Sequence, residues 1–231
     1  MPDAKPLKTG GKIFAKGNYA AYTSPTHLEH QQFISGALGG FRPGDSKGQR
    51  MRQITDGNSM TLAIAEVRIR DDEQDPRGAW AVPWAGSSLL AADIHFHPTL
   101  PPISGRIRID APYLPITTYP RSATQFPNSS IGFGDQIRPV PDKQASLLDG
   151  MPCGRYQAYG TWFASAATRS RHPGGIYSVW LAGHVQYVSD DIDIVTCAHH
   201  LCVHEGGQSD SPSSSELKVL MGATAYPVPG R

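Results

Sequence analysis

The pattern of apolar and polar positions predicts strands, and it is clearest between residues 169 and 193. Two apolar runs rich in β-branched and aromatic side chains, Ile176–Leu181 and Val185–Val188, are separated by Ala182-Gly183. The cluster His172-Pro173-Gly174-Gly175 precedes them and favours a chain reversal or bend, since proline fixes φ and glycine permits positive φ. Two such runs around a two-residue break predict a β-hairpin.

The expected register of this hairpin places Trp180 opposite Val185 and Ser178 opposite Tyr187. Both faces are then partly apolar, so we expect a central element that is covered on both sides. A two-residue turn of type I′ needs positive φ at its first central position, which strains Ala182 by about 1 kcal/mol. Replacing Ala182 by Asp or Asn is therefore expected to stabilise the hairpin. In a type II turn only Gly183 has positive φ, and the replacement would then gain little.

Weaker patterns predict further elements before and after the hairpin. Met60–Arg70 alternates as a buried strand does, although an Ala-rich helix competes with that interpretation. The remaining expected elements are strands at Gly17–Tyr22, Gly78–Trp84 and Glu216–Met221, and a short helix over Asp190–Val203 capped by Asp190 or Asp191. Antiparallel pairing of Met60–Arg70 with Gly78–Trp84 is the natural arrangement.

These elements predict an α+β fold that is mostly β, with an antiparallel sheet and one or two short helices. Residues 1–16 are expected to be a flexible lead-in, and 17–231 a single domain. Within it, residues 85–159 are rich in Pro and Gly, and the chain holds 20 Pro and 24 Gly in all. We expect this segment to be an insertion over one face of the sheet, with short strands such as Arg106–Ile109.

The charge and hydropathy of the chain argue against several classes of binding partner. Charged residues make up only 18% of the chain, and 21 basic residues nearly balance 20 acidic ones, so nothing indicates nucleic-acid binding. No apolar run of about 18 residues predicts a membrane span, and the first sixteen residues lack the apolar core of a signal peptide. Three cysteines, Cys153, Cys197 and Cys202, leave at least one unpaired within a chain, while a bridge from Cys153 to either of the others stays open.

Several short motifs, in order along residues 17–208, resemble those of the prepilin-processing-associated proteins of planctomycete-type bacteria. Their signature is a His, nine residues, then Asp-Gly; His172 and Gly183 match it, and Ala182 stands where the family has Asp. Asp56 and Gly57 lie in Ile54–Thr61, which is similar to the family's I-T-D-G-T-S-N-T, and Glu66 follows as the family's Glu does. The other matching positions are Asn18-Tyr19, Gly40-Phe41, Arg77-Gly78-Ala79-Trp80, Met151-Pro152-Cys153 and Ser170-Arg171-His172-Pro173-Gly174-Gly175.

This resemblance implies a pseudopilin-like, non-enzymatic domain of unknown biochemical role, exported to the cell envelope for assembly or surface display. In the relatives, the antiparallel sheet packs on an N-terminal prepilin helix. The first sixteen residues do not predict such a helix, so we expect either a fragment or late start of a longer chain, or a soluble relative. A sheet without that helix has one bare apolar face, so we expect either self-association or cover from residues 85–159. The resemblance implies no cofactor, and protein partners rather than nucleic acid.

Two groups of residues offer metal binding as the alternative function. Asp93, His95 and His97 share one face of an extended segment, a spacing that can hold a first-row metal ion. On a helix Cys197, His200 and His204 also share a face, although the spacing is not that of usual zinc sites and core packing explains Cys197 as well. A metal-dependent enzyme or binding module built on Asp93, His95 and His97 is therefore the runner-up.

Other chemistry has less support. Gly57-Asn58-Ser59 approaches a nucleophile elbow but lacks its second glycine, so Asp56 and Ser59 are better explained as turn residues. For His172 we expect a ring nitrogen bonded to a backbone carbonyl, holding the turn, rather than catalysis. A carbohydrate-binding module is a third possibility, with four tryptophans as candidate platforms: Trp80, Trp84, Trp162 and Trp180.

Overall fold

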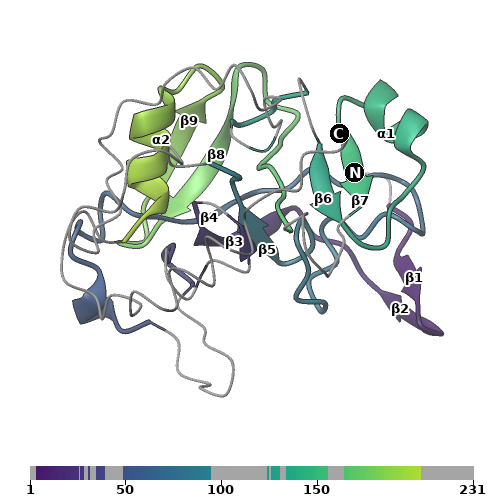
Figure 1. Cartoon of the computed structure of the whole chain (residues 1–231), viewed down its shortest axis with the longest axis horizontal. Helices are drawn as coiled ribbons and strands as arrows, with labels where there is room; N and C mark the ends of the chain where they lie inside the picture. The colour runs from purple at the N-terminus through teal and green to yellow at the C-terminus, as the bar shows by residue number, and fades with distance from the viewer. Residues whose placement is uncertain are drawn as a thin grey trace, which may run out of the picture.

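The computed structural model describes residues 4–25, 27, 28, 31, 35–39, 49–94, 124, 126–130, 134–155 and 164–203. Within these residues the chain is built around a five-stranded sheet of order β5-β3-β4-β8-β9 (Figure 1). Its strands are β3 (Tyr19–Ser24), β4 (Leu62–Glu66), β5 (Leu89–Ala91), β8 (Gly175–Trp180) and β9 (Val185–Ser189). Neighbouring strands run antiparallel except β3 and β5, which are parallel. The predicted α+β, mostly β fold is confirmed.

One face of this sheet carries the main core, because alternate residues of a strand point to the same side. Helix α2 (Ile194–Leu201) packs against this inner face, and Figure 1 shows it beside β8 and β9. Buried residues of the core include Ala20, Tyr22, Leu62, Ala65, Ile176, Trp180 and Val188 from the strands, and Cys197, Ala198 and Leu201 from α2. The strand interpretation of Met60–Arg70 is confirmed, and its helical alternative is wrong.

Two smaller sheets flank the large one. Strands β6 (Asp135–Ile137) and β7 (Cys153–Arg155) pair in parallel, and helix α1 (Lys143–Leu148) connects them. Strands β1 (Leu7–Thr9) and β2 (Lys12–Phe14) form a hairpin inside the segment that we expected to be a flexible lead-in. Leu7 holds this hairpin in place, since its fully buried side chain packs with Ala79 and Val82. A 3₁₀ turn, η2 (Met51–Gln53), precedes β4.

The strand predicted at Gly78–Trp84 is wrong, and so is its pairing with β4. This segment is a series of turns in which Ala79 N bonds Pro76 O and Val82 N bonds Ala79 O. Gly78 has φ of +79°, and a Cβ there would lie 2.3 Å from the backbone oxygen of Gly17. Strand β4 pairs instead with β3 and β8.

The segment predicted as an insertion contributes to the sheet itself. Its strand β5 forms one edge of the five-stranded sheet, parallel to β3, while β6, α1 and β7 form a separate group. The strands predicted at Arg106–Ile109 and Glu216–Met221 lie outside the described residues.

The β8–β9 hairpin is present, but its predicted register is wrong by one residue. Val179, not Trp180, is opposite Val185, and Tyr177 is opposite Tyr187. The loop has three residues, since Trp180 N bonds His184 O at 2.9 Å and Gly183 N bonds Trp180 O at 2.8 Å. A one-residue slip moves side chains to the other face, so Val185 and Tyr187 point away from the core.

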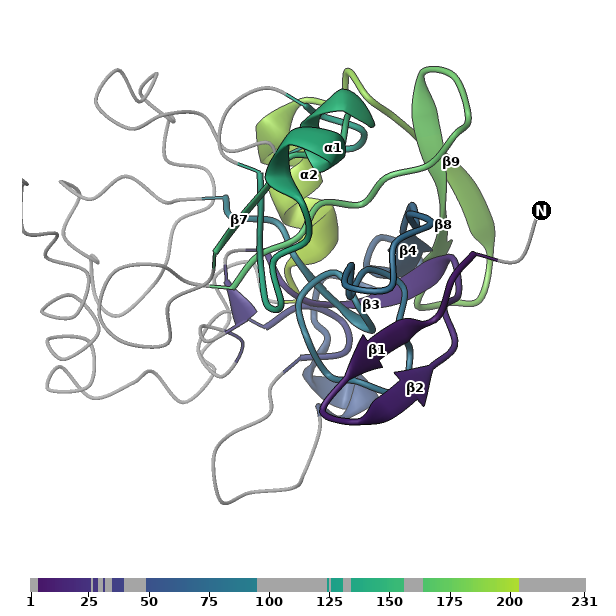
Figure 2. The ribbon, with the colours of Figure 1, turned by 90° about the vertical axis from the view of Figure 1, so that its right-hand side faces the viewer.

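The hairpin is also not covered on both sides as expected. Strand β9 is an edge of the sheet, and Figure 2 shows the β8–β9 ribbon at the margin of the molecule with α2 on its inner side. Val185 is 63% exposed, and the side chains of Tyr177 and Tyr187 are about two-fifths exposed (43% and 41%).

Helix α2 begins later than predicted. The carboxylate of Asp193 accepts a hydrogen bond of 3.0 Å from the amide of Thr196, which is the interaction of an N-cap residue. Asp190, predicted as a cap, instead accepts a 2.9 Å hydrogen bond from Asn128.

The turn geometry yields a prediction about Ala182 and Gly183. Gly183 has φ of +89°, whereas Ala182 does not have positive φ, so Ala182 is not strained. A three-residue hairpin loop of this kind needs glycine at its last position. We therefore expect Gly183→Ala to lower the free energy of unfolding by about 1–2 kcal/mol.

The matched control is Ala182→Asn. We expect little change in its free energy of unfolding, whereas a type I′ turn predicts that this variant is more stable than the native chain. Thermal denaturation of both variants measures these effects. A clear gain in melting temperature for Ala182→Asn would show that the three-residue loop is incorrect.

Candidate functional site

Glu66 and His172, both motif positions, come together at one end of β4. The carboxylate of Glu66 lies at the end of β4 and accepts a 2.8 Å hydrogen bond from the amide of Tyr177. Its other oxygen lies 3.2 Å from Nε2 of His172. Glu66 thus joins β4 to the start of the hairpin through both carboxylate oxygens.

The Pro-Gly-Gly segment after His172 allows close approach of the two hairpin strands. Gly174 has φ of +79°, and a Cβ on Gly175 would lie 2.3 Å from the backbone oxygen of Val188. The hydroxyl of Tyr187 donates a 2.6 Å hydrogen bond to the carbonyl of Pro173. These glycines are therefore required by the backbone geometry.

His172 has a different partner from the one predicted. Its ring nitrogen faces the Glu66 carboxylate rather than a backbone carbonyl, and its ring lies edge-on to Tyr177 with centroids 5.0 Å apart. The expected role of holding the turn is consistent with these contacts, since both join the segment before β8 to β4 and β8.

The Asp56-Gly57 turn meets the tip of the same hairpin. Gly57 has φ of +92°, and its carbonyl accepts a hydrogen bond from Met60 N at 3.0 Å. Leu181 N donates to Thr61 O at 2.8 Å, and Ala182 N donates to Asn58 O at 2.9 Å. The position where this chain departs from the family signature, Ala182, therefore hydrogen-bonds the other motif turn through its backbone.

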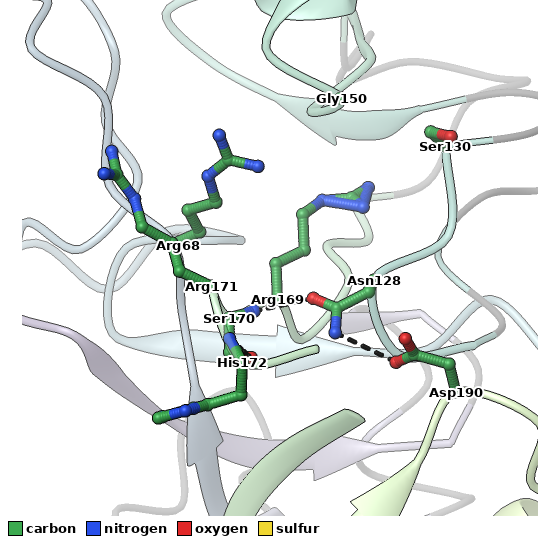
Figure 3. A pocket seen from close by; sticks show the side chains of 9 residues that line it. All are labelled: Arg68, Asn128, Ser130, Gly150, Arg169, Ser170, Arg171, His172 and Asp190. Carbon is green, nitrogen blue, oxygen red and sulfur yellow. Dashed lines mark hydrogen bonds between the residues drawn. The ribbon is translucent and has the colours of Figure 1, made fainter. Parts of the chain in front are cut away.

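Beside His172, residues 170–172 line a pocket of about 500 Å³ that opens to solvent (Figure 3). Asn128 organises one side of it: its amide nitrogen donates to Asp190 at 2.9 Å and its carbonyl oxygen accepts from Ser170 N at 2.7 Å. Arg68, Arg169 and Arg171 line the pocket too. The pocket is therefore polar, because its wall carries the guanidinium groups of these arginines as well as the carboxylate of Asp190.

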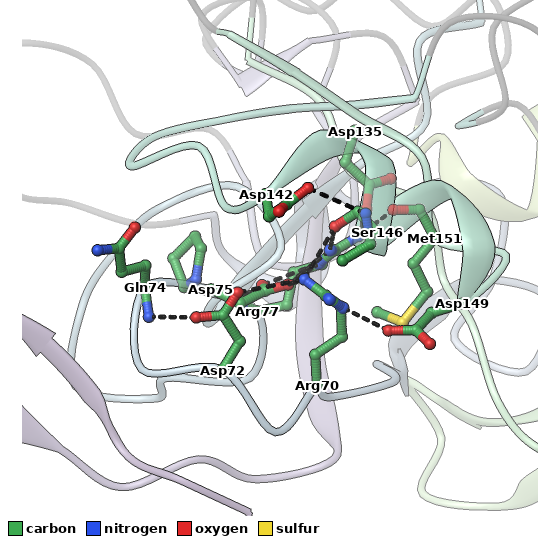
Figure 4. Close-up of polar contacts among 12 residues, drawn as sticks. Arg70, Asp72, Gln74, Asp75, Arg77, Asp135, Asp142, Ser146, Asp149 and Met151 are labelled. Atoms are coloured by element: carbon green, nitrogen blue, oxygen red, sulfur yellow. Dashed lines mark hydrogen bonds and ion pairs between the residues drawn. The ribbon is translucent and has the colours of Figure 1, made fainter.

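A buried ionic network lies behind this pocket, centred on Arg77 (Figure 4). Arg77 uses Nε and Nη2 to bind both carboxylate oxygens of Asp75, at 2.9 and 2.6 Å. Its Nη1 donates to Asp135 at 3.0 Å, and further bonds of 2.9 Å reach Ser146 Oγ and Met151 O. A guanidinium has five N–H donors, so every donor of Arg77 has an acceptor.

Asp135 continues the network to the segment before β8. One of its oxygens accepts 3.0 Å hydrogen bonds from Ala167 N and from Nη2 of Arg169. The side chains of Asp75, Arg77, Asp135 and Arg169 are at most 2% exposed, and they carry two positive and two negative charges. These four side chains therefore carry no net charge, and Arg70, which lies 3.6 Å from Asp75, also pairs with Asp72 and Asp149.

The protonation states follow from these contacts. Burial opposes ionisation of Asp75, but the charge and hydrogen bonds of Arg77 outweigh it and hold the pKa of Asp75 below its ordinary value. For Arg77, burial favours loss of the proton, yet Asp75 and Asp135 raise its pKa. Burial lowers the pKa of Arg169, although Asp135 opposes that change.

Sequence reasoning missed this network. Arg77 and Met151 stand in motif matches, but Asp135 is 58 positions from Arg77 and follows no pattern that pairs the two. One signal in the sequence could have indicated an ion pair. Asp75 is a carboxylate two positions before the motif residue Arg77, in a chain with few charged residues.

The side of the sheet opposite α2, which we call the outer face, consists of two cross-strand rows. Strand pairing aligns Ala21, Ile64, Val179 and Val185 in one row, and it places Tyr19, Glu66, Tyr177 and Tyr187 in the other. Tyr177 and Tyr187 contact edge-on, with ring centroids 5.4 Å apart. Tyr19, Tyr177 and Tyr187 are each more than 40% exposed, so the outer face is both apolar and accessible.

The first predicted metal site is tested only in part. Asp93 pairs with Nε2 of His27, while His95 and His97 lie outside the described residues. The described residues hold no group of three or more His, Cys, Asp or Glu placed to bind one metal ion. Metal binding by Asp93, His95 and His97 stays a prediction.

The second group of possible ligands is partly engaged in packing. Burial raises the pKa of the Cys197 thiol to about 12, which disfavours the thiolate that binds metal ions. His200 lies edge-on to Trp180, with ring centroids 4.7 Å apart, and His204 is outside the described residues. All three cysteines are free thiols, so the open possibility of a bridge to Cys153 is not realised.

The described tryptophans do not form one platform. Trp180 is buried in the core and stacks on His184, whereas Trp80 is 57% exposed and lies against Gly17. Trp84 packs with the cluster around Leu7, and Trp162 is outside the described residues. Neither described α-helix has the length and apolar character needed to cross a bilayer.

Comparison with known proteins identifies one family. The model of a family described as a protein of unknown function (DUF1559) matches residues 5–194. No curated protein matches the sequence. No solved structure matches it either.

The buried network yields a prediction about stability. We expect Arg77→Met to lower the free energy of unfolding by about 3–5 kcal/mol, because it leaves Asp75 and Asp135 buried without their main counter-charge. Urea denaturation measures the loss, and the exposed Arg52→Met serves as control, with an expected change within about 0.5 kcal/mol. A loss below about 1 kcal/mol in Arg77→Met would contradict a structural role for the network.

The lowered pKa of Asp75 yields a prediction about pH. A group whose pKa is lower in the folded state stabilises the fold above its unfolded pKa, about 3.9, and this contribution is lost as pH falls through the folded value. The stability difference between the native chain and Asp75→Asn is therefore constant from pH 7 to about pH 5 and shrinks below about pH 4.

Denaturation at a series of pH values tests this, with Asp71→Asn as control because Asp71 is two-thirds exposed. A difference between native chain and Asp75→Asn that is the same at pH 3 and pH 7 would refute the assignment.

Proposed function

The chain belongs to the DUF1559 family of proteins of unknown function, and from this premise we propose that it is a non-enzymatic, pseudopilin-like protein of the cell envelope that assembles through its outer face. The exposed rows of that face carry the proposal. Soluble monomers rarely expose large contiguous apolar patches, and such patches commonly mark interaction surfaces.

The composition of the outer face suits a protein interface. Tyrosine is enriched at interfaces because its ring offers a large apolar area and its hydroxyl stays hydrated at the rim. Three tyrosines and Val185 provide these groups on three strands. The resemblance to pseudopilins supports the same use, since their sheet packs against another apolar element.

The occupant that we propose is a second copy of this chain. Two sheet faces pack at about 10 Å when their side chains interdigitate, and a face that meets its own copy gives a closed dimer. The polar groups of the motif region support a non-enzymatic role, because His172 and Glu66 hold each other and the Arg77 network is used internally.

Sedimentation equilibrium of the native chain and of Tyr19→Lys/Val185→Lys tests the proposal. We expect the native chain to self-associate with rising concentration and the double variant to do so at least about tenfold more weakly, which corresponds to about 1.4 kcal/mol. Lysine at exposed strand positions is compatible with the fold, and its charge opposes association of the sheet with another sheet, whether through their edges or their faces.

The control is Ile13→Lys/Leu148→Lys, which adds the same charges at exposed apolar positions on β2 and α1. It should associate as the native chain does. A native chain that stays monomeric at high concentration, or equal weakening in both double variants, would overturn assembly through the outer face.

A further inference from the structure

Two arginines at the pocket beside His172, Arg68 and Arg171, form no ion pair within the described part of the chain. They form no hydrogen bond with a described residue either. The neighbouring arginines differ: Arg70 binds Asp149 at 2.6 Å, and Arg169 binds Asp135. The pocket therefore carries surplus positive charge within a chain whose net charge is only +1.

The guanidinium groups are arranged on a common side. Figure 3 shows Arg68 and Arg171 beside each other at one wall of the pocket, on the side opposite Asp190, with Arg169 next to them. The Nε atoms of Arg68 and of the fully buried Arg169 are shielded from solvent and have no hydrogen-bond acceptor. Buried donors without acceptors are costly, so an acceptor supplied by a ligand would stabilise this arrangement.

The charges also repel one another. Burial lowers the pKa of Arg68, and the nearby charge of Arg171 lowers it further, while Asp149 opposes the change. Groups whose pKa is shifted by burial and by a nearby charge cluster at functional sites.

The opposite side of the pocket has different chemistry. Asp190 and Asn128 lie across from Arg68 and Arg171, joined by the hydrogen bond of 2.9 Å (Figure 3). A carboxylate accepts hydrogen bonds from hydroxyl groups, whereas guanidinium groups bind phosphate or sulfate oxygens through parallel N–H donors. The volume, about 500 Å³, is in the usual range for small-molecule sites.

We propose that this pocket binds a small hydroxylated ester of phosphate or sulfate, with Arg68 and Arg171 on the oxyanion and Asp190 on the hydroxyl groups. The site goes beyond the proposed function and is independent of it, because the outer face can assemble whether or not the pocket is filled.

Isothermal titration calorimetry at constant ionic strength tests the proposal with three probes: inorganic phosphate, glucose 6-phosphate and glucose. We expect saturable binding of both phosphates, tighter binding of glucose 6-phosphate, and none of glucose alone. Binding should weaken as salt is raised, because the contacts are between charges.

Variants assign the roles. Arg68→Gln/Arg171→Gln is expected to weaken phosphate binding at least about tenfold, while its melting temperature equals or exceeds that of the native chain because a repulsion is removed. Lys12→Gln/Arg52→Gln, which removes two exposed positive charges elsewhere, should bind as the native chain does. Asp190→Asn should reduce the preference for glucose 6-phosphate over inorganic phosphate.

Arg171→Gln alone guards against loss of fold, since Arg171 is exposed and forms no hydrogen bond or ion pair with a described residue. It should also weaken phosphate binding. Absence of saturable binding to the native chain, undiminished binding to the arginine variants, or equal weakening in the Lys12/Arg52 control would each overturn the proposal. Monomeric behaviour of the native chain would overturn assembly through the outer face but leave this result unaffected.

Discussion

The fold depends on placing one guanidinium, that of Arg77, where water cannot reach it. Removing such a charge from water costs several kcal/mol unless every donor is matched, and Asp75, Asp135, Ser146 Oγ and Met151 O match all five. These acceptors come from the turn after β4, from β6, from α1 and from the segment before β7. Each of these parts is short and contributes few apolar side chains, so the ionic contacts specify how they assemble.

The same arrangement explains why the two sides of the large sheet differ. The inner face is completed by α2, and Asp135 links the smaller β6–β7 sheet to the segment leading into β8 through Ala167 N and Arg169. The outer face is left with tyrosines and valines, and the pocket beside His172 with two arginines that form no ion pair with a described residue. The buried charged groups are thus paired with one another, whereas Arg68 and Arg171 are the groups that we propose for binding.

The strands with strong period-two patterns, such as β3, β4, β8 and β9, could be predicted from the sequence, and so could a helix near α2. The hairpin register could not, because Trp180 and Val179 are both apolar and only the three-residue loop decides which of them is opposite Val185. The strand predicted at Gly78–Trp84 is wrong because the positive φ of Gly78 and its close contact with Gly17 determine turns that the local pattern does not reveal. The motif residues Glu66 and His172 were identified, whereas their pairing and the Arg77 network needed long-range contacts.

Native-state hydrogen exchange tests the central claim most directly, because it measures the opening free energy of individual amides. The informative amides are those of Arg77, Asp135 and Ala167, which bond Asp75 Oδ1, Pro152 O and Asp135 Oδ1. If the network holds the fold together, the opening free energy of these amides in the native chain equals that of the β8 amides. In Arg77→Met, the opening free energy of the network amides falls clearly below that of the β8 amides. Exchange of the network amides in the native chain several kcal/mol below those of β8 would contradict the account.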